Sequence, residues 1–305
     1  MRYWLRHITR MSAPMALLLL VCALGMWVID YIRMPELWGT ILGSQLLTLF
    51  SGLLLCMTLY RAKVSEDFSL LPAVLYVAAV GVLPNLREHW EPQLIAAILL
   101  LFLHATRNMT DNHEPNSMVM LMTILLCITA LWVPDAIWCI LMLWLVVLLQ
   151  GTFTLRTIVA SLLGIILVGI YYAILLYFDI ADMWEYNELF EREWFGVSSP
   201  ICITATVGVM YAGFLCVAGG AFRRSSYDLV SARMLLYHAV LTGLLSSPLI
   251  VFTTVNQDIW VLLPLSLSTT AGIYMLQHES ESRGVSLLLY LIGAVALYMW
   301  IVLVL

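Results

Sequence analysis

Residues 155–178, LRTIVASLLGIILVGIYYAILLYF, make up a long apolar stretch whose single charged side chain, Arg156, lies near its start. A helix of this length rises about 36 Å, at about 1.5 Å per residue, whereas the hydrocarbon core of a bilayer is about 30 Å thick. Residues 179–196, DIADMWEYNELFEREWFG, follow directly and contain six carboxylates against one cation, Arg192. This change from apolar to acidic sequence predicts a transmembrane helix that ends at a wet surface.

The composition extends this prediction to the whole chain. The mean hydropathy is +0.97, and 63% of the residues are hydrophobic while only 11% are charged. Soluble domains have about 25% charged residues, so most of this chain has lipid as its solvent. The net charge of −5 gives no reason to expect nucleic acid as a partner. The six cysteines all fall in apolar runs without a CxxC pair, which indicates buried hydrophobic side chains.

Span length predicts an all-α, polytopic transmembrane helix bundle that forms one integral membrane domain over residues 1–305. A span needs about 20 apolar residues, and about eleven segments qualify. The third and fourth are short and bounded by prolines, so they are either thin, tilted helices or a re-entrant pair. The predicted spans are Ala13–Ile32, Leu37–Tyr60, Phe68–Leu83, Pro92–Thr106, Ser117–Val133, Asp135–Leu149, Leu155–Phe178, Pro200–Phe222, Met234–Val255, Ile259–Gln277 and Val285–Leu305.

Loop charge gives the orientation. Short cytoplasmic loops of membrane proteins collect Lys and Arg, and alternation of these spans puts all but Arg33, Arg87 and Arg192 on one side. The N-terminus is therefore predicted to be cytoplasmic and the C-terminus to lie outside. The basic side contains Arg2, Arg6, Arg10, Arg61, Lys63, Arg107, Arg156, Arg223, Arg224, Arg233 and Arg283.

The acidic stretch has two interpretations. On a helix, the aromatic side chains of residues 179–199 share one broad side and most carboxylates lie on the other, which predicts an amphipathic helix at the outer interface. Alternatively, Glu185, Glu188 and Glu191 recur every three residues, and such an oxygen-rich stripe can hold a hard cation such as Ca²⁺ or Mg²⁺. The stretch contains no EF-hand pattern, so a solvated cap on the bundle is the favoured interpretation.

Two short outer loops carry the candidate catalytic residues. DYIRMPE (residues 30–36) contains Asp30, and NLREHWE (residues 85–91) contains Arg87 and His89. If the loops adjoin, an arginine fork could bind a phosphate while a carboxylate or His89 acts as a general base. This arrangement would suit an enzyme that acts on a lipid-linked, polyprenyl or phosphate-bearing envelope intermediate. The alternative is that these residues form loop ion pairs and helix caps.

Two further classes of function are a metal oxidase and a transporter. No two histidines have the HxxxH or HxxHH spacing of di-iron membrane hydroxylases, which argues against a metal oxidase. The span interiors offer no ionisable relay, so proton coupling is disfavoured. A small-solute transporter stays open, because the hydroxyls of Thr253–Thr254 and Ser268–Thr270 near Pro248 and Pro264 could line a cavity; routine packing of hydroxyl groups is its rival.

Several segments carry a resemblance to a known family. They are LLPAVLYVAAVGVLPNLREHWEP (residues 70–92), LWVPDAIWCILMLW (131–144), the basic loop FRRSSYDLVSAR (222–233) and WVLLPLSLSTTAGIYML (260–276). In this order they resemble a family of multi-pass inner-membrane proteins from Bacteroidota that is catalogued only as a domain of unknown function. Some members are labelled beta-carotene monooxygenase. The resemblance implies an inner-membrane location with the acidic face toward the periplasm, and it brings no catalytic residues.

Taken together, these observations favour a non-enzymatic scaffold or assembly component of the cell envelope, with no cofactor. Its expected partners are the bilayer and a membrane protein or a lipid-linked intermediate. Short outer loops that are rich in Trp, Glu and Arg are plausible docking surfaces.

Overall fold

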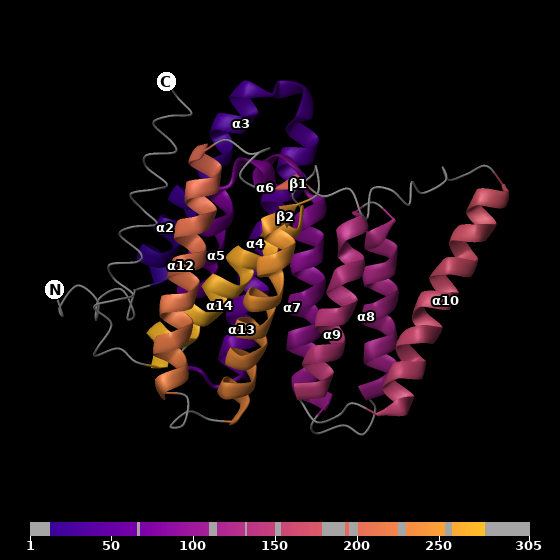
Figure 1. Cartoon of the computed structure of the whole chain (residues 1–305). Helices are drawn as coiled ribbons and strands as arrows, with labels where there is room; N and C mark the ends of the chain where they lie inside the picture. The colour runs from indigo at the N-terminus through magenta and orange to yellow at the C-terminus, as the bar shows by residue number, and fades with distance from the viewer. Residues whose placement is uncertain are drawn as a thin grey trace.

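The computed structural model describes residues 13–65, 68–109, 115–131, 133–149, 154–178, 193–194, 201–224, 230–253 and 258–277. These residues form a helical bundle, as predicted (Figure 1). Among the described residues, five helices are long and apolar enough to cross a membrane, which indicates a membrane protein. They are Pro35–Arg61, Leu155–Tyr177, Ile203–Arg223, Ala232–Val251 and Asp258–Gln277, and four shorter apolar helices accompany them.

The first part of the chain breaks its helices twice. The prediction of one continuous span over Ala13–Ile32 is wrong, because α2 ends at Leu24 and a separate short helix, α3, begins at Trp27. Gly25 closes the last turn of α2 by donating to the carbonyls of Val21 and Cys22. The second break follows α5, which ends before Pro84. The elements are α2 (Ala13–Leu24), α3 (Trp27–Arg33), η1 (Pro35–Leu37), α4 (Trp38–Arg61), α5 (Leu71–Gly81), α6 (Pro84–Glu88) and α7 (Glu91–Met109).

The second part consists mostly of unbroken helices whose bounds lie within a few residues of the predicted spans. The predicted span Met234–Val255 is displaced toward the N-terminus, since its helix ends at Val251. The predicted last span, Val285–Leu305, lies outside the described residues. The elements are α8 (Pro115–Ala130), η2 (Pro134–Ile137), α9 (Trp138–Leu149), α10 (Leu155–Tyr177), α12 (Ile201–Arg224), α13 (Val230–Val251), η5 (Asp258–Val261) and α14 (Leu262–Gln277).

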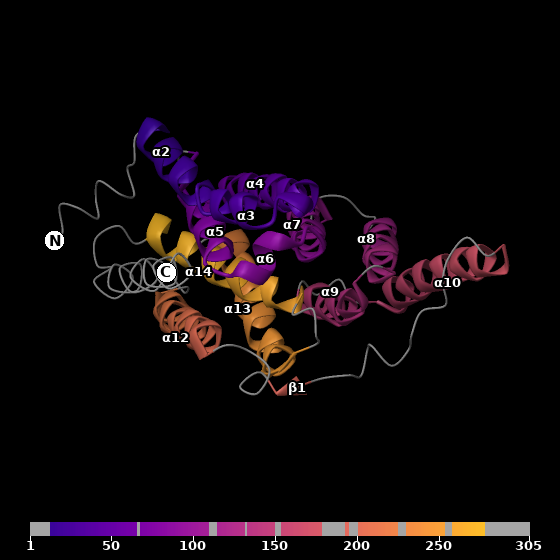
Figure 2. The same cartoon turned by 90° about the horizontal axis from the view of Figure 1, so that it is seen from above.

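The helices differ greatly in how far they are buried. In the apolar stretch of the Asp258–Gln277 segment, which contains α14, 94% of the residues are buried, and α14 packs against α5, α12 and α13. By contrast, only 17% of the residues in the apolar stretch of α10 are buried, and this helix lies at one edge of the bundle, mainly against α8 (Figures 1 and 2). Its contact with α8 depends on small residues, because a Cβ on Gly164 would stand 3.1 Å from the Met120 carbonyl oxygen. The remaining surface of α10 is an exposed apolar flank.

Most of the acidic stretch lies outside the described residues, and Glu185, Glu188 and Glu191 lie there too. Only Glu193 and Trp194 are described, as the strand β1 (Glu193–Trp194), which pairs antiparallel with β2 (Phe252–Thr253). The prediction that the amphipathic helix includes Glu193 and Trp194 is therefore wrong. The extended pairing with the residues that follow α13 takes precedence over the local helical pattern at these two positions.

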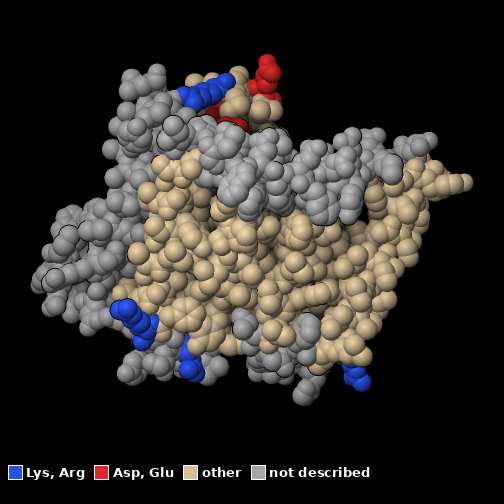
Figure 3. All heavy atoms as spheres, in the orientation of Figure 1, with Lys and Arg blue, Asp and Glu red and all other residues tan. Residues whose placement is uncertain are grey.

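Charges separate between the two ends of the bundle. Arg61 is the last residue of α4, Lys63 follows it closely, and Arg156 lies in the first turn of α10; all three side chains are exposed. At the opposite end, Arg33 and Glu36 are exposed near the start of α4. Figure 3 shows basic groups projecting at the lower end, whereas the upper end has red carboxylates beside a basic group. The upper end in Figures 1 and 3 is called the acidic end below.

Candidate functional site

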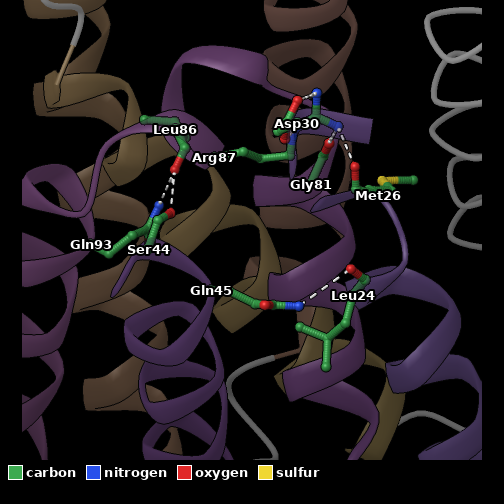
Figure 4. Close-up of polar contacts among 9 residues, drawn as sticks. All are labelled: Leu24, Met26, Asp30, Ser44, Gln45, Gly81, Leu86, Arg87 and Gln93. Carbon is green, nitrogen blue, oxygen red and sulfur yellow. Dashed lines mark hydrogen bonds and ion pairs between the residues drawn. The ribbon is translucent and has the colours of Figure 1, made fainter. Parts of the chain in front are cut away.

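The segments that carry Asp30 and Arg87 do adjoin, which the sequence had left as a condition of the catalytic hypothesis. Asp30 lies in α3 and Arg87 in α6, and their side chains are only 4% and 5% exposed. The Arg87 Nε lies 2.9 Å from Asp30 Oδ2, and Nη2 donates to Oδ1 at 3.1 Å (Figure 4). The guanidinium therefore meets the carboxylate at two points, one a hydrogen bond from Nη2 and the other an ion-pair contact of Nε that is not a hydrogen bond. The fork that the sequence offered to a phosphate is therefore occupied by Asp30.

The third nitrogen of Arg87 serves the helix breaks. Nη1 donates to the Gly81 carbonyl at 2.9 Å, and it approaches the Met26 carbonyl at 3.5 Å. Gly81 ends α5, and Met26 lies between α2 and α3. Helix ends leave carbonyls without a partner inside the helix, and inside an apolar bundle each such carbonyl needs a donor. One arginine thus joins both breaks and the carboxylate of α3.

Burial disfavours the charged forms of both Asp30 and Arg87. It raises the pKa of Asp30 to about 6, although the positive charges of Arg87 and Arg33 lower that pKa. Burial also lowers the pKa of Arg87, against the opposing effect of the Asp30 charge. Both residues belong to short helices that are not among the apolar helices able to cross a membrane. The charge of each residue offsets part of the cost of burying the other.

Polar side chains of α4 and α7 serve further carbonyls near the same breaks. Ser44 Oγ and Gln93 Nε2 both donate to the Leu86 carbonyl of α6, at 2.9 and 3.2 Å. Gln45 Nε2 lies 3.5 Å from the carbonyl of Leu24, the last residue of α2. We call Asp30, Ser44, Gln45, Arg87 and Gln93 the helix-break cluster (Figure 4).

Two tyrosines hold the amides of this cluster in place. The Tyr76 hydroxyl donates to Gln93 Oε1 at 2.9 Å, and the Tyr31 hydroxyl donates to Gln45 Oε1 at 3.0 Å. Each amide therefore accepts through its oxygen while its nitrogen points at a backbone carbonyl. Tyr76 and Gln93 are both fully buried, so their bond is made away from water. A satisfied network of this kind specifies one arrangement of the helices.

His89 stands apart from the other two predicted catalytic residues. It is the residue after α6, and its side chain is exposed, whereas Asp30 and Arg87 are buried. The structure therefore brings together two of the three residues and points to a supporting role for them. The sequence reasoning did not identify Gln93 and Ser44 as part of this site. The signal that could have revealed them is a polar side chain inside an apolar span near a Gly or Pro break.

The other candidate sites have less support. Within the described ranges, no group of three His, Cys, Asp or Glu side chains is placed to hold a metal ion, and the Glu185, Glu188 and Glu191 stripe is not among them. The hydroxyls of Ser268, Thr269 and Thr270 are buried in α14, and each donates to a carbonyl of its own helix. Thr254 lies outside the described residues. The transporter hypothesis stays a prediction.

Comparisons with known proteins add no relative. No family model matches this chain, no curated protein matches it, and no solved structure matches it. The resemblance to the Bacteroidota family accordingly stays a prediction.

Proposed function

We propose that this chain is a multi-pass protein of the bacterial inner membrane that acts as a non-enzymatic scaffold or assembly component of the envelope. The observation that carries this proposal is that the polar groups of the helix-break cluster bond to other helices of the bundle. Arg87 contacts Asp30 and the Gly81 carbonyl, and Gln93 contacts Tyr76 and the Leu86 carbonyl. These polar groups connect one helix to another, which is what a rigid scaffold requires.

The proposed topology has about eleven spans in a single domain, with a cytoplasmic N-terminus and a periplasmic C-terminus. The separation of charge supports this orientation. Arg61, Lys63 and Arg156 lie at the end that would face the cytoplasm, as the positive-inside rule expects. The acidic end would then face the periplasm, and the acidic segment 179–199 would lie at that surface.

The corner formed by α3, η1 and the start of α4 is the proposed docking surface. Ile32, Leu37 and Trp38 are 76%, 42% and 61% exposed there, and the charged side chains of Arg33 and Glu36 lie among them. From Pro35 to Arg61 the helical segment rises about 40 Å, which exceeds a hydrocarbon core of about 30 Å. Exposed Trp and aliphatic side chains with charges at their edge are typical of protein interfaces.

The partner should be detected by purification in a mild detergent followed by mass spectrometry. We expect a stoichiometric protein partner on the wild-type chain and a several-fold loss of it from the Ile32→Ala/Trp38→Ala variant. Leu163→Ala, on the exposed flank of α10, is the matched control and should keep the partner. Absence of any stoichiometric protein from the wild-type preparation would argue against the scaffold function.

An enzyme acting on a lipid-linked intermediate is the second candidate, and the adjacency of Asp30 and Arg87 near the acidic end favours it. On that hypothesis Arg87 would exchange part of its contact with Asp30 for a phosphate. The same purification separates the two functions. A retained polyprenyl phosphate that is lost when Arg87 is replaced would favour the enzyme, whereas the scaffold proposal expects the protein partner.

A further inference from the structure

An apolar groove lies between α9 and α13, outside the helix-break cluster. Its volume is about 420 Å³, within the range of known ligand pockets. Met142 is buried and forms the floor, Trp138, Trp144 and Leu245 are half-buried walls, and Pro248 stands exposed at the rim. Leu, Met, Pro and Trp side chains make up the whole lining. The groove can therefore hold hydrocarbon but offers no charge to a polar ligand.

The walls of the groove are held from behind. The Trp144 indole N–H donates to Ser161 Oγ of α10 at 2.9 Å, and Thr123 Oγ1 of α8 lies 3.0 Å from the same oxygen. This fixes the ring of Trp144 against the groove. In α13, Pro248 has no N–H for the Leu244 carbonyl, and the Ser247 hydroxyl donates to that carbonyl at 2.6 Å instead. The groove is thus built into the fold before any ligand arrives.

The dimensions and surroundings of the groove indicate its occupant. From Trp138 to Leu148 it follows α9 for about 16 Å, close to half of a hydrocarbon core of about 30 Å. One leaflet of a bilayer, and therefore one acyl chain, has that length. Leu141 and Leu148 in the lining of the groove are 50% and 52% exposed, so its rim belongs to the apolar surface of the bundle. The mouth of the groove opens onto the surface that lipid covers.

We propose that this groove binds one acyl chain of a membrane phospholipid and retains it more tightly than the rest of the apolar surface does. The walls contact the chain on two sides and the floor contacts it on a third, whereas the flank of α10 would contact a lipid on one side only. More apolar area is therefore buried per chain in the groove. The inference depends on the membrane location of the protein and not on its scaffold function.

The test uses the full-length protein in vesicles that contain phosphatidylethanolamine with a photoactivatable diazirine on its acyl chain. After irradiation, peptide mapping locates the label. We expect several-fold more label on the α9 and α13 peptides of the groove than on α10, and a loss of that label when unlabelled phospholipid is added in excess before irradiation. Equal labelling of the groove and α10 would overturn the proposal.

Two variants make the test specific. Leu245→Trp fills the groove from its wall and should reduce labelling there several-fold, while Leu163→Trp on the flank of α10 should leave it unchanged. If Leu245→Trp does not fold, Leu148→Trp narrows the mouth from an exposed position and should act in the same direction. Unchanged labelling in a folded groove variant would contradict the proposal. If polyprenyl phosphate displaces the label and phospholipid does not, the groove binds a prenyl chain, and the proposal of an acyl chain is wrong.

Discussion

Replacing Arg87 by methionine is expected to lower the free energy of unfolding by about 3–5 kcal/mol, the usual cost of removing one partner from a buried ion pair. The substitution leaves the Asp30 carboxylate buried without its partner, because Asp30 is only 4% exposed. It also removes the donor to the Gly81 carbonyl at the end of α5. Methionine keeps much of the volume of the arginine side chain, so the loss measures the charge and its hydrogen bonds.

The measurement is the melting temperature of the detergent-solubilised protein, followed by size-exclusion chromatography after heating. Arg33→Met is the matched control, because Arg33 is exposed on the same helix as Asp30, and it should melt close to wild type. The variant Asp30→Leu/Arg87→Met should recover most of the loss, since replacing both members of a buried pair by apolar side chains is often neutral. If Arg87→Met alone melts at the same temperature as the wild type, the ion pair does not hold α3 to α6.

Gly243→Ala is expected to lower the free energy of unfolding by about 3 kcal/mol, at the upper end of the cost of overpacking a core. A Cβ on Gly243 of α13 would overlap the ring of Phe214 on α12. Phe214 is fully buried, so its ring cannot move without disturbing other core residues. Alanine could be accommodated only if the Phe214 ring shifted within the core or the two helices separated.

Two further variants identify the cause of this effect. Gly219→Ala in α12 is the matched control, because a Cβ there would meet nothing within 4 Å. It should be neutral or stabilise the protein by about 0.5–1 kcal/mol, since alanine is the better helix former. Phe214→Leu should reduce the cost of Gly243→Ala, because the smaller side chain leaves room for the new methyl group. If Gly243→Ala and Gly219→Ala melt alike, the close approach of α12 and α13 is contradicted.

Helix positions could be predicted from the sequence because the length of an apolar run is set by the solvent around it. The predicted span Leu37–Tyr60 became α4 (Trp38–Arg61), and Leu155–Phe178 became α10 (Leu155–Tyr177). The break after Leu24 could not be predicted in this way, because hydropathy stays high across Gly25 and Met26. An isolated glycine in an apolar run is only weak evidence for a break.

The candidate site was only partly predictable for a different reason. Loop adjacency could be proposed for Asp30 and Arg87, but the sequence could not show that both arms of the fork would be occupied. The contact of Ser44 with the Leu86 carbonyl joins positions 42 residues apart, so no local pattern announces it. In a bundle with broken helices, polar side chains serve carbonyls whose positions are known only once the helices are packed.

The most direct test of the account is complementation by the Asp30→Leu/Arg87→Met variant. It is expressed at the wild-type level in a strain that lacks the gene and has a measurable envelope defect, and its folded state is checked by size-exclusion chromatography. If Asp30 and Arg87 only hold the helix breaks together, the folded variant restores the envelope as the wild type does. A folded variant that fails to restore it would contradict the account and assign chemistry to these two residues.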